Sequence, residues 1–391
     1  MKSNYDVLGN HIRLVDTRNK DNITDRVLGI NIDKFFMPSV ANVIGTDLSK
    51  YKLISKGKFA CNPMHVGRDE RLPVALYEED APAIVSPAYF MFEIKDHMVL
   101  DENYLMMWFR RSEFDRICWL HTDGSVRGGI TWDDICRLEL PVPPIEEQKE
   151  IVNQYKAITD RITLKKQIND NLVAVGVGSI QKNVGRGALI NLTEAEMDSL
   201  SLPENFSIKT VSEFCLDTKS GSTPSRTNNE YWENGTISWV KSGEVHNNIT
   251  LQTEEYITPL GLNKSSTKIL PKDTVLMAMY GVTAGEVGYL AIEATTNQAI
   301  CGMICHTKAE AAYLYFSLIQ SQAAISRLSN GGAQDNLSKN FIEAIKLVVP
   351  PSEYIENLNL TAIIEQMTLN TKEIALLEEL QSTVLAQLSS R

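Results

Sequence analysis

The sequence predicts an α+β protein with two pseudo-repeated α/β domains separated by two long antiparallel coiled-coil helices. Three observations support this fold class. The chain has 391 residues, more than one hydrophobic core usually organises. A short apolar strand ending in a proline pair occurs twice, at Pro143-Pro144 and Pro350-Pro351, 207 residues apart. Each pair is followed by a long segment whose apolar residues recur at helical spacing.

The composition is that of an ordinary globular protein, with 43% hydrophobic and 22% charged residues. The first residues lack the apolar core of a signal peptide. The longest apolar runs, such as Val275 to Tyr280, are too short to span a bilayer. We therefore expect a cytoplasmic protein without a membrane partner.

The first long helix is expected from about Ile145 to Leu172. A proline pair suits a helix beginning, because proline lacks the N–H that the first turn leaves unpaired anyway. Glu146 and Glu147 follow the pair and favour a helix N-terminus. The expected apolar stripe consists of Ile151, Tyr155, Ile158 and Ile162.

The second long helix is expected from about Ser352 to Leu388. Its apolar positions alternate steps of three and four residues, which is the pattern of a heptad seam. The seam comprises Leu360, Ile363, Met367, Asn370, Ile374, Leu377, Gln381, Val384 and Leu388. Equivalent placement in two repeats favours mutual antiparallel packing over two helices packed on separate domain cores. At 1.5 Å per residue, each helix would measure on the order of 40–50 Å.

The globular parts before the helices correspond loosely to each other, with offsets of about 203 to 216 residues. Val, Ile, Thr and Tyr between Gly and Pro predict strands with some helix. The predicted organisation is a first domain at 1–140, a first helix at 141–180, a linker with the second domain at 181–345, and a second helix at 346–391. Gly176 to Gly187, with four glycines, is the expected linker.

The six cysteines form no C-x-x-C pair, and Cys301-x-x-x-Cys305-His306 is the cluster that most resembles a metal site. It lies in an apolar run that predicts a buried strand with Cys301, Met303 and Cys305 on one face. We interpret these residues as core cysteines of a reducing compartment and expect no metal site.

The proline-pair segment carries a family resemblance. Pro143-Pro144-Ile145-Glu146-Glu147-Gln148 is similar to the motif that opens the spacer helices of type I restriction–modification specificity subunits. Pro350-Pro351-Ser352-Glu353 is a weaker match because it lacks the Gln. Five further segments resemble the target recognition domains of that family: Gly221-Ser222-Thr223-Pro224-Ser225, Glu230-Tyr231-Trp232, Ile237-Ser238-Trp239-Val240, Thr296-Asn297-Gln298-Ala299 and Gly331-Gly332-Ala333-Gln334.

The resemblance, which covers nearly the whole chain, implies a non-catalytic DNA-reading subunit. Two target recognition domains would each read one part of a split, asymmetric site in double-stranded DNA. The helices would fix the gap between these parts and dock two methyltransferase subunits. The chain itself would bind no cofactor. S-adenosylmethionine would belong to the methyltransferase subunits, and ATP with magnesium to the restriction subunits.

The acidic charge modifies this expectation. The net charge is −11, with a balance of −3 over residues 1–140 and −6 over residues 186–345. DNA phosphates are normally bound by basic surface. We therefore expect partner subunits to supply much of the phosphate neutralisation.

The sequence matches no catalytic motif of a methyltransferase or nuclease. An adenine methyltransferase needs Asp or Asn before Pro-Pro and an aromatic residue, but Asn62-Pro63-Met64 lacks the second proline and the aromatic. Gly281 to Gly288 misses the dinucleotide-binding spacing, and its glycines are expected to serve turns between strands. We expect no catalytic residue, and base flipping would belong to a partner.

The candidate DNA contacts are polar residues on expected loops. Side chains suited to adenine edges are Gln298, Gln334 and Asn336, and those suited to guanine are Arg68 and Arg127. Side chains suited to phosphates are Arg110, Arg111, Thr223, Ser225, Lys241, Ser242 and Lys339. Competing interpretations are a simple turn at Gly331-Gly332, a buried polar network at Asn297-Gln298 and a solvated helix face at Arg110-Arg111. Trp232 and Trp239 are expected in the core.

Three alternatives remain at this point. The chain could serve a related system in which modification and cleavage share one polypeptide. It could itself be a methyltransferase or nuclease, or it could be a coiled-coil scaffold without DNA contact.

Overall fold

The computed structural model describes residues 4–64, 66–122, 128–190, 192–246, 248–329 and 336–388. The chain divides into two compact units. The first unit comprises residues 1–161 and 377–391, and the second comprises residues 162–376. Sheets and helices occur in both units, so the predicted α+β class is confirmed.

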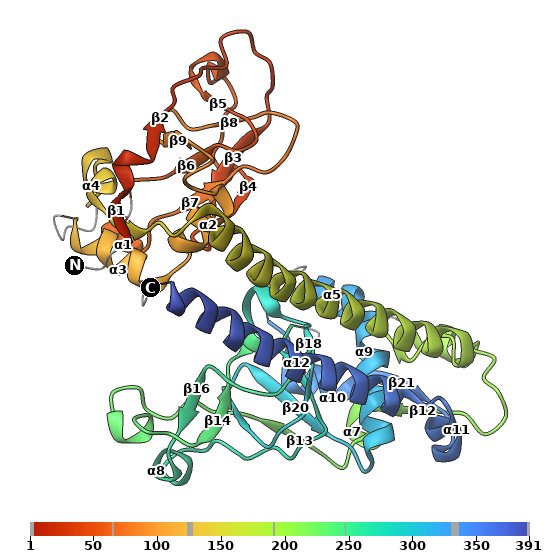
Figure 1. Ribbon diagram of the computed structural model, residues 1–391. Helices are drawn as coiled ribbons and strands as arrows, with labels where there is room; N and C mark the ends of the chain where they lie inside the picture. The colour runs from red at the N-terminus through yellow and green to blue at the C-terminus, as the bar shows by residue number, and fades with distance from the viewer. Residues whose placement is uncertain are drawn as a thin grey trace. The chain divides into compact units, whose positions relative to one another are not determined.

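Within its described residues the first unit contains three small sheets, most of whose strands are labelled in Figure 1. One pairs β1 (Tyr5–Val7) with β10 (Glu139–Pro141). The second has the order β2 (Ile12–Leu14), β9 (Phe90–Ile94), β6 (Phe59–Cys61), β7 (Val74–Leu76). The third has the order β4 (Phe36–Pro38), β3 (Val27–Ile30), β8 (Ala83–Val85), β5 (Lys52–Ile54). The short helices are α1 (Val66–Asp69), α2 (Glu102–Phe109), α3 (Ser112–Leu120) and α4 (Trp132–Arg137).

The part of the second unit that the structure describes likewise contains three sheets. The first has the order β11 (Ala188–Leu189), β21 (Lys346–Val349), β12 (Ser207–Thr210). The second has the order β13 (Asp217–Ser220), β20 (Ile300–Ile304), β17 (Thr274–Ala278), β18 (Val287–Leu290), β15 (Ile249–Thr250). The third has the order β16 (Glu255–Ile257), β14 (Ile237–Val240), β19 (Thr295–Thr296). The helices are α6 (Glu194–Asp198), α7 (Val211–Phe214), α8 (Pro259–Asn263), α9 (Lys308–Ser329), α10 (Lys339–Ala344) and α11 (Ser352–Asn357).

The strand orders of the two units match, which confirms the predicted pseudo-repeat. The order β2-β9-β6-β7 corresponds to β13-β20-β17-β18, and β4-β3-β8 corresponds to β16-β14-β19. The pairs β3–β8 and β14–β19 are parallel, whereas the other corresponding pairs are antiparallel. Both strands predicted before the proline pairs form, as β10 and β21.

Each unit has its own hydrophobic core. In the first unit, Phe59, Phe92 and Phe109 are buried among helix residues of α2 and α3. Ile151, Tyr155 and Leu388 of the long helices are buried in this same core. In the second unit, α9 supplies Tyr313, Tyr315 and Phe316 to a core that also buries Leu360 and Met367. The long helices therefore contribute to the core of each unit.

The first long helix differs from its prediction at its end. It is α5 (Ile145–Asn183), which continues through Gly176 and Gly178, two of the four glycines expected to form the linker. A Cβ atom on Gly176 would lie 2.3 Å from the Phe316 ring, so the glycine lets α9 approach the helix rather than ending it. At 1.5 Å per residue its 39 residues span about 58 Å, which exceeds the expected length.

The second long helix also differs from its prediction, because it starts later than expected. The segment after the second proline pair forms the short helix α11, and a separate helix α12 (Leu360–Gln387) follows. Asn359 between them has a φ of 54°, which is a left-handed conformation incompatible with a continuous helix. The heptad pattern identified the helix but did not identify this break.

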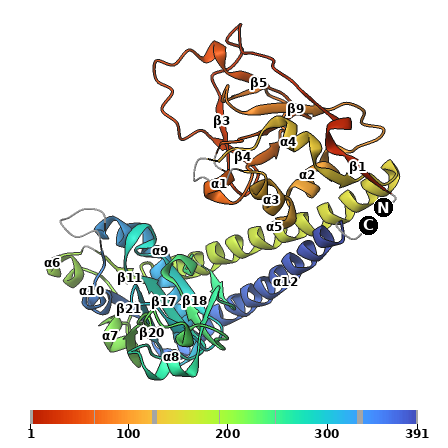
Figure 2. The same cartoon turned by 90° about the vertical axis from the view of Figure 1, so that its left-hand side faces the viewer.

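The predicted seam residues lie between helices of the same chain. Figure 2 shows α5 and α12 running alongside each other. In the second unit, Asn370 Nδ2 donates to Asn169 Oδ1 (2.9 Å), and Lys165 Nζ lies 2.8 Å from Glu373 Oε2. In the first unit, Gln381 Nε2 donates to Thr159 Oγ1 (2.8 Å). Both polar breaks in the seam therefore have a partner on the facing helix, which is antiparallel.

The ten seam residues proposed for partner docking are covered by their own chain. Those that are buried are Ile151, Tyr155, Ile162, Leu360, Met367 and Ile374. Those that are half-buried are Ile158, Ile363, Leu377 and Val384. A partner subunit would therefore meet other faces of these helices.

Candidate nucleic-acid interface

Three of the predicted DNA contacts gather at one end of the sheet β13-β20-β17-β18. Met279 N donates to Ala299 O (2.8 Å) just beyond the paired residues of β17 and β20, which places Tyr280 beside Gln298. Tyr280 forms a β-bridge with Asn336. Thr223 Oγ1 donates to Gln298 Oε1 (2.5 Å). We call Thr223, Tyr280, Val282, Gln298 and Asn336 the sheet-end cluster.

A close backbone approach holds the Thr223 loop on this sheet end. A Cβ atom on Gly221 would lie 2.1 Å from Thr296 O, so only glycine fits there. Ser222 N donates to Thr296 O (2.9 Å). Asn297 Oδ1 accepts from Ala299 N (3.0 Å) and closes a short turn around Gln298. The Gln298 side chain at this turn is exposed. Gln298 is therefore a surface residue, not part of a buried polar network.

The turn between β17 and β18 completes the cluster. Gly281 and Gly285 have φ values of 73° and 89°, which confirms that these glycines serve a turn. Gly285 N donates to Ala278 O (2.8 Å), and Ser326 Oγ of α9 donates to Ala284 O (3.1 Å). Val282 lies in this turn and is fully exposed. The turn is thus fixed at its base while an apolar side chain stands free in solvent.

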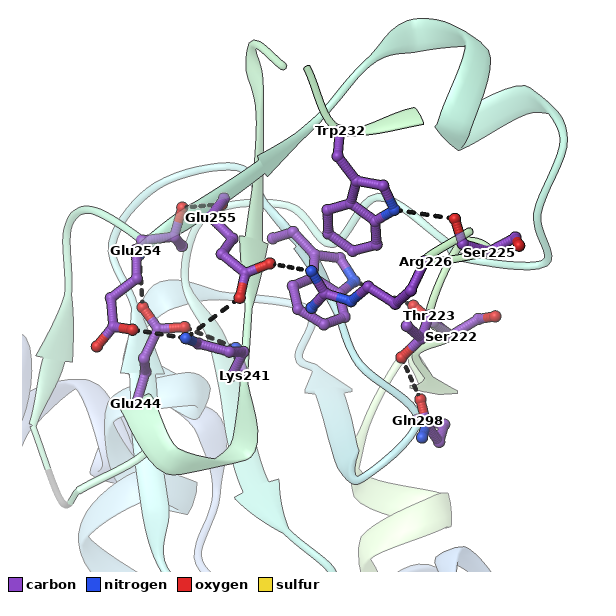
Figure 3. A network of polar contacts seen from close by, with 12 residues as sticks. Ser222, Thr223, Ser225, Arg226, Trp232, Lys241, Glu244, Glu254, Glu255 and Gln298 are labelled. Carbon is purple, nitrogen blue, oxygen red and sulfur yellow. Dashed lines mark hydrogen bonds and ion pairs between the residues drawn. The ribbon is translucent and has the colours of Figure 1, made fainter. Parts of the chain in front are cut away.

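A polar network lies on the neighbouring sheet β16-β14-β19, and Figure 3 shows it. The Arg226 guanidinium stacks on Trp232, with 3.7 Å from Cζ to the ring centroid, and it also pairs with Glu255. Lys241 Nζ contacts Glu254 (2.5 Å) and Glu255 (3.3 Å). Arg226, which directly follows Ser225, thus links the loop of Thr223 and Ser225 to this sheet.

The charges of this network are paired within the protein. The hydrogen bond to Glu254 raises the pKa of Lys241 above its ordinary value. The hydrogen bond from Arg226 lowers the pKa of Glu255 below its ordinary value. Because its ammonium group already has two carboxylate partners, Lys241 would have to exchange them to bind a phosphate.

The two tryptophans act as a support for this network. Trp239 is buried, as expected, and its Nε1 donates to Ser222 O (3.0 Å). Trp232 is half-buried, packs edge-to-face on Trp239 at 5.0 Å, and donates from Nε1 to Ser225 O (3.1 Å). The two indole N–H groups thus bind the backbone of the loop that carries Thr223.

The first unit has an equivalent sheet end. Ile130 N donates to Pro63 O (3.2 Å), and Leu337 N donates to Met279 O (2.8 Å) at the equivalent place in the second unit. Met64, the counterpart of Tyr280, is exposed. Arg68 lies in α1 just after this turn, is exposed, and pairs with Asp69 (2.6 Å).

Arg110 and Arg111 of the first unit differ in their exposure to solvent. Arg110 follows α2 and is exposed, whereas Arg111 is 8% exposed and its Nε has no hydrogen-bond partner. The interpretation of both as one solvated helix face is therefore wrong for Arg111. Burial makes Arg111 a poor candidate for a phosphate contact.

The remaining candidates that the structure describes, Ser225, Ser242 and Lys339, lie in separate segments of the second unit. Ser225 is exposed and bonds to Thr227 Oγ1 (2.9 Å). Ser242 begins a short 3-10 helix, Ser242–Glu244. Lys339 pairs with Glu343 (3.1 Å) within α10. Arg127 and Gln334 lie outside the described residues, as does Gly331-Gly332.

Sequence reasoning missed three residues of this candidate interface, Tyr280, Val282 and Arg226. The signal for the first two was the segment Tyr280-Gly281-Val282, in which a large side chain stands on each side of a turn glycine, an unusual composition for a turn. The signal for Arg226 was its position directly after the Gly221 to Ser225 motif. The buried pair of Lys34 and Asp115 (2.8 Å), which links the β3–β4 hairpin to α3, was also missed.

The cysteine cluster is part of the core. Cys301 and Met303 are buried in β20, and the strand was predicted correctly. Within the described residues, no group of His, Cys, Asp and Glu side chains has the arrangement of a metal site. None of the helices in the described part of the chain has the length and hydropathy needed to cross a membrane.

Comparison with known proteins identifies relatives over the whole chain. Residues 74–174 and 203–379 match the family described as "Type I restriction modification DNA specificity domain". The chain is 22% identical to the type I restriction enzyme HindI specificity subunit of Haemophilus influenzae, covering 97% of each chain. It is 24% identical to the EcoR124I/EcoR124II specificity subunit of Escherichia coli over 55% of this chain and 52% of that one.

A solved structure shows a similar fold. It is the S subunit of a type I restriction–modification system from M. genitalium, with a TM-score of 0.53 and 16% identity. The superposition covers 98% of this chain and 95% of that chain.

Proposed function

The chain belongs to the type I restriction–modification DNA specificity family, and from that premise we propose that it reads a two-part DNA sequence for a restriction–modification complex. The observation that carries this proposal is the duplicated sheet end. Each unit presents an equivalent turn, anchored by an equivalent backbone hydrogen bond, at Pro63 and at Met279. The exposed side chains differ between the units, so the two half-sites should differ as well.

The second unit supplies the better-defined interface. Gln298 and Asn336 carry amides that match the hydrogen-bonding edge of adenine. Both are exposed, and Gln298 is held by Thr223. Thr223 and Ser225 add hydroxyl groups that suit phosphate or sugar contacts. In the first unit, Arg68 is the equivalent candidate for a guanine contact.

Methylation and cleavage belong to partner subunits in this proposal. The relatives that this chain resembles, one along nearly all of its length and one along about half, are specificity subunits. Two methyltransferase subunits would carry S-adenosylmethionine, and restriction subunits would use ATP and magnesium. The methyltransferase subunits would dock on the faces of α5 and α12 that lie away from the buried seam.

The chain alone should bind DNA weakly. Its net charge is −11, and the candidate cations Arg68, Lys241 and Lys339 already pair with carboxylates. Phosphate contacts provide most of the affinity for DNA, and they require free positive charge. Partner subunits would therefore supply much of the affinity, while this chain supplies the sequence preference.

A methylome comparison tests the proposal. Genomes are compared with and without this gene, in cells that express the methyltransferase partner. We expect a split adenine-methylation motif to disappear when the gene is removed. An unchanged methylome with an active partner would refute the proposal. Methyl transfer by the purified chain with S-adenosylmethionine alone would show that the chain is itself the enzyme.

A helix deletion tests the proposed spacing role. Removing residues 160–166 from α5 and 374–380 from α12 deletes one heptad from each helix. It leaves the facing contacts Thr159–Gln381 and Asn169–Asn370 in place. Seven residues correspond to about 10 Å of helix, or about three base pairs of DNA. We expect the unspecified gap in the methylated motif to shorten by about three base pairs, whereas an unchanged gap would exclude this role.

A further inference from the structure

Val282 combines full exposure with a fixed position. It lies in the 3-10 turn Gly281–Thr283 between β17 and β18. The turn closes through Gly285 N to Ala278 O (2.8 Å) and Glu286 N to Thr283 O (2.9 Å). Ser326 of α9 binds the same turn at Ala284 O (3.1 Å). These hydrogen bonds fix the backbone of the turn, and the isopropyl group of Val282 stands in solvent beyond it.

A single exposed apolar residue is common on protein surfaces. Val282 has two features that set it apart. The neighbouring Tyr280 is exposed as well, so the turn presents two apolar side chains together. The equivalent turn of the first unit again presents an exposed apolar residue, Met64. Both units thus place apolar groups at the same sheet end.

The surroundings of Val282 indicate what it meets. Tyr280 lies beside Gln298 and forms a β-bridge with Asn336, so exposed amides flank the apolar turn. The major-groove edge of an A·T pair offers adenine N6 and N7 to an amide and the thymine C5-methyl to an apolar group. This combination of side chains matches that edge.

We propose that Val282 contacts the C5-methyl group of a thymine in the major groove of the half-site read by the second unit. Gln298 and Asn336 are the flanking amides that read adenine in the same region. This inference rests on the proposed function and adds one specific base contact to it. Val282 is thus a specificity-determining residue of the second unit.

The test uses the full chain in complex with its methyltransferase partner. The probe is a duplex carrying the motif found in the methylome, with each thymine replaced in turn by deoxyuridine, which lacks the methyl group. We expect the wild-type complex to lose about fourfold in affinity at one thymine, the factor for one buried methyl-sized group. The Val282→Ala complex should bind that uracil duplex and the thymine duplex equally.

Leu216→Ala is the matched control. Leu216 is also exposed and precedes β13 at the opposite end of the same sheet, so its variant should keep the wild-type sensitivity. A wild-type complex that is insensitive at every thymine would overturn the inference, as would a Val282→Ala complex that stays sensitive. Failure of the proposed function gives a different result, which appears in the methylome comparison: no methylated motif would then disappear when the gene is removed.

Discussion

Gln148 and Ile355 occupy equivalent positions, four residues after the second proline of their repeats, but they hold the two helices in different ways. Gln148 is fully buried, accepts from Asp101 N (2.9 Å) and donates to Val99 O (2.8 Å) and Pro143 O (2.7 Å). Ile355 is buried in the apolar core of the second unit. The start of α5 is thus fixed by hydrogen bonds, and the short helix α11 by apolar packing.

Replacing Gln148 by leucine should destabilise the first unit. Two carbonyl groups and one amide N–H would lose their partner in a buried position, at a cost of about 2–4 kcal/mol in unfolding free energy. Chemical denaturation of the full chain measures this loss. Gln154→Leu on the exposed side of α5 is the control, with an expected change below about 0.5 kcal/mol. Equal effects of both variants would show that the hydrogen bonds of Gln148 are not important.

Two glycines of α5 should respond to alanine in opposite directions. A Cβ atom on Gly176 would collide with the buried ring of Phe316, whereas one on Gly178 meets nothing within 4 Å. Gly176→Ala should lower the unfolding free energy by about 1–3 kcal/mol through overpacking. Gly178→Ala should raise it by about 0.5–1 kcal/mol, because alanine favours a helix. Thermal unfolding distinguishes these outcomes, and a shift in the same direction for both would contradict the packing seen at Phe316.

Asn169 of α5 and Asn370 of α12 should be energetically coupled, because they bond to each other between the two helices. Asn370 is buried and bonds to Asn169, Lys165 and Gln366. Asn370→Leu leaves Asn169 without this partner and should cost about 1–3 kcal/mol. Adding Asn169→Leu should restore part of the loss, giving a coupling energy of about 0.5–3 kcal/mol in a double-mutant cycle. Additive effects of the two substitutions would show that the residues do not interact.

Buried cysteines should resist alkylation in the native state. Burial raises the pKa of Cys61 and of Cys301 to about 12, and it also raises the pKa of Cys118. The thiolate is the reactive form, so iodoacetamide near pH 8 should label these three residues only after unfolding. Mass spectrometry locates the labels. The half-buried Cys136 is the internal control and should react first. Rapid native labelling of Cys61 would contradict the burial of its strand.

The sequence predicted the layout better than the boundaries. The proline pairs and the heptad seam identified both helices, because these signals are local and periodic. The end of α5 could not be found from the glycine content, because Gly176 is set by the approach of Phe316, which is 140 residues away. The break before α12 was missed for a similar reason. Asn359 adopts a left-handed conformation that its residue type permits but does not demand.

The sequence also identified part of the candidate interface. Thr223, Gln298 and Asn336 were chosen as separate polar loop residues, and the sheet register brings them together. Arg111 and Lys241 could not be judged from sequence, because burial and carboxylate partners depend on segments distant in the chain. Val282 was overlooked because an isolated apolar residue in a glycine-rich segment has no periodic pattern.

The hydrogen bonds at Pro63 and Met279 have a consequence for how such a protein can change over time. Both are made by backbone atoms, Ile130 N with Pro63 O and Leu337 N with Met279 O. Substitutions of most exposed side chains nearby leave these bonds intact, so stability and base preference can drift separately. A lineage could therefore acquire a new DNA target through a few surface mutations without first passing through a misfolded ancestor.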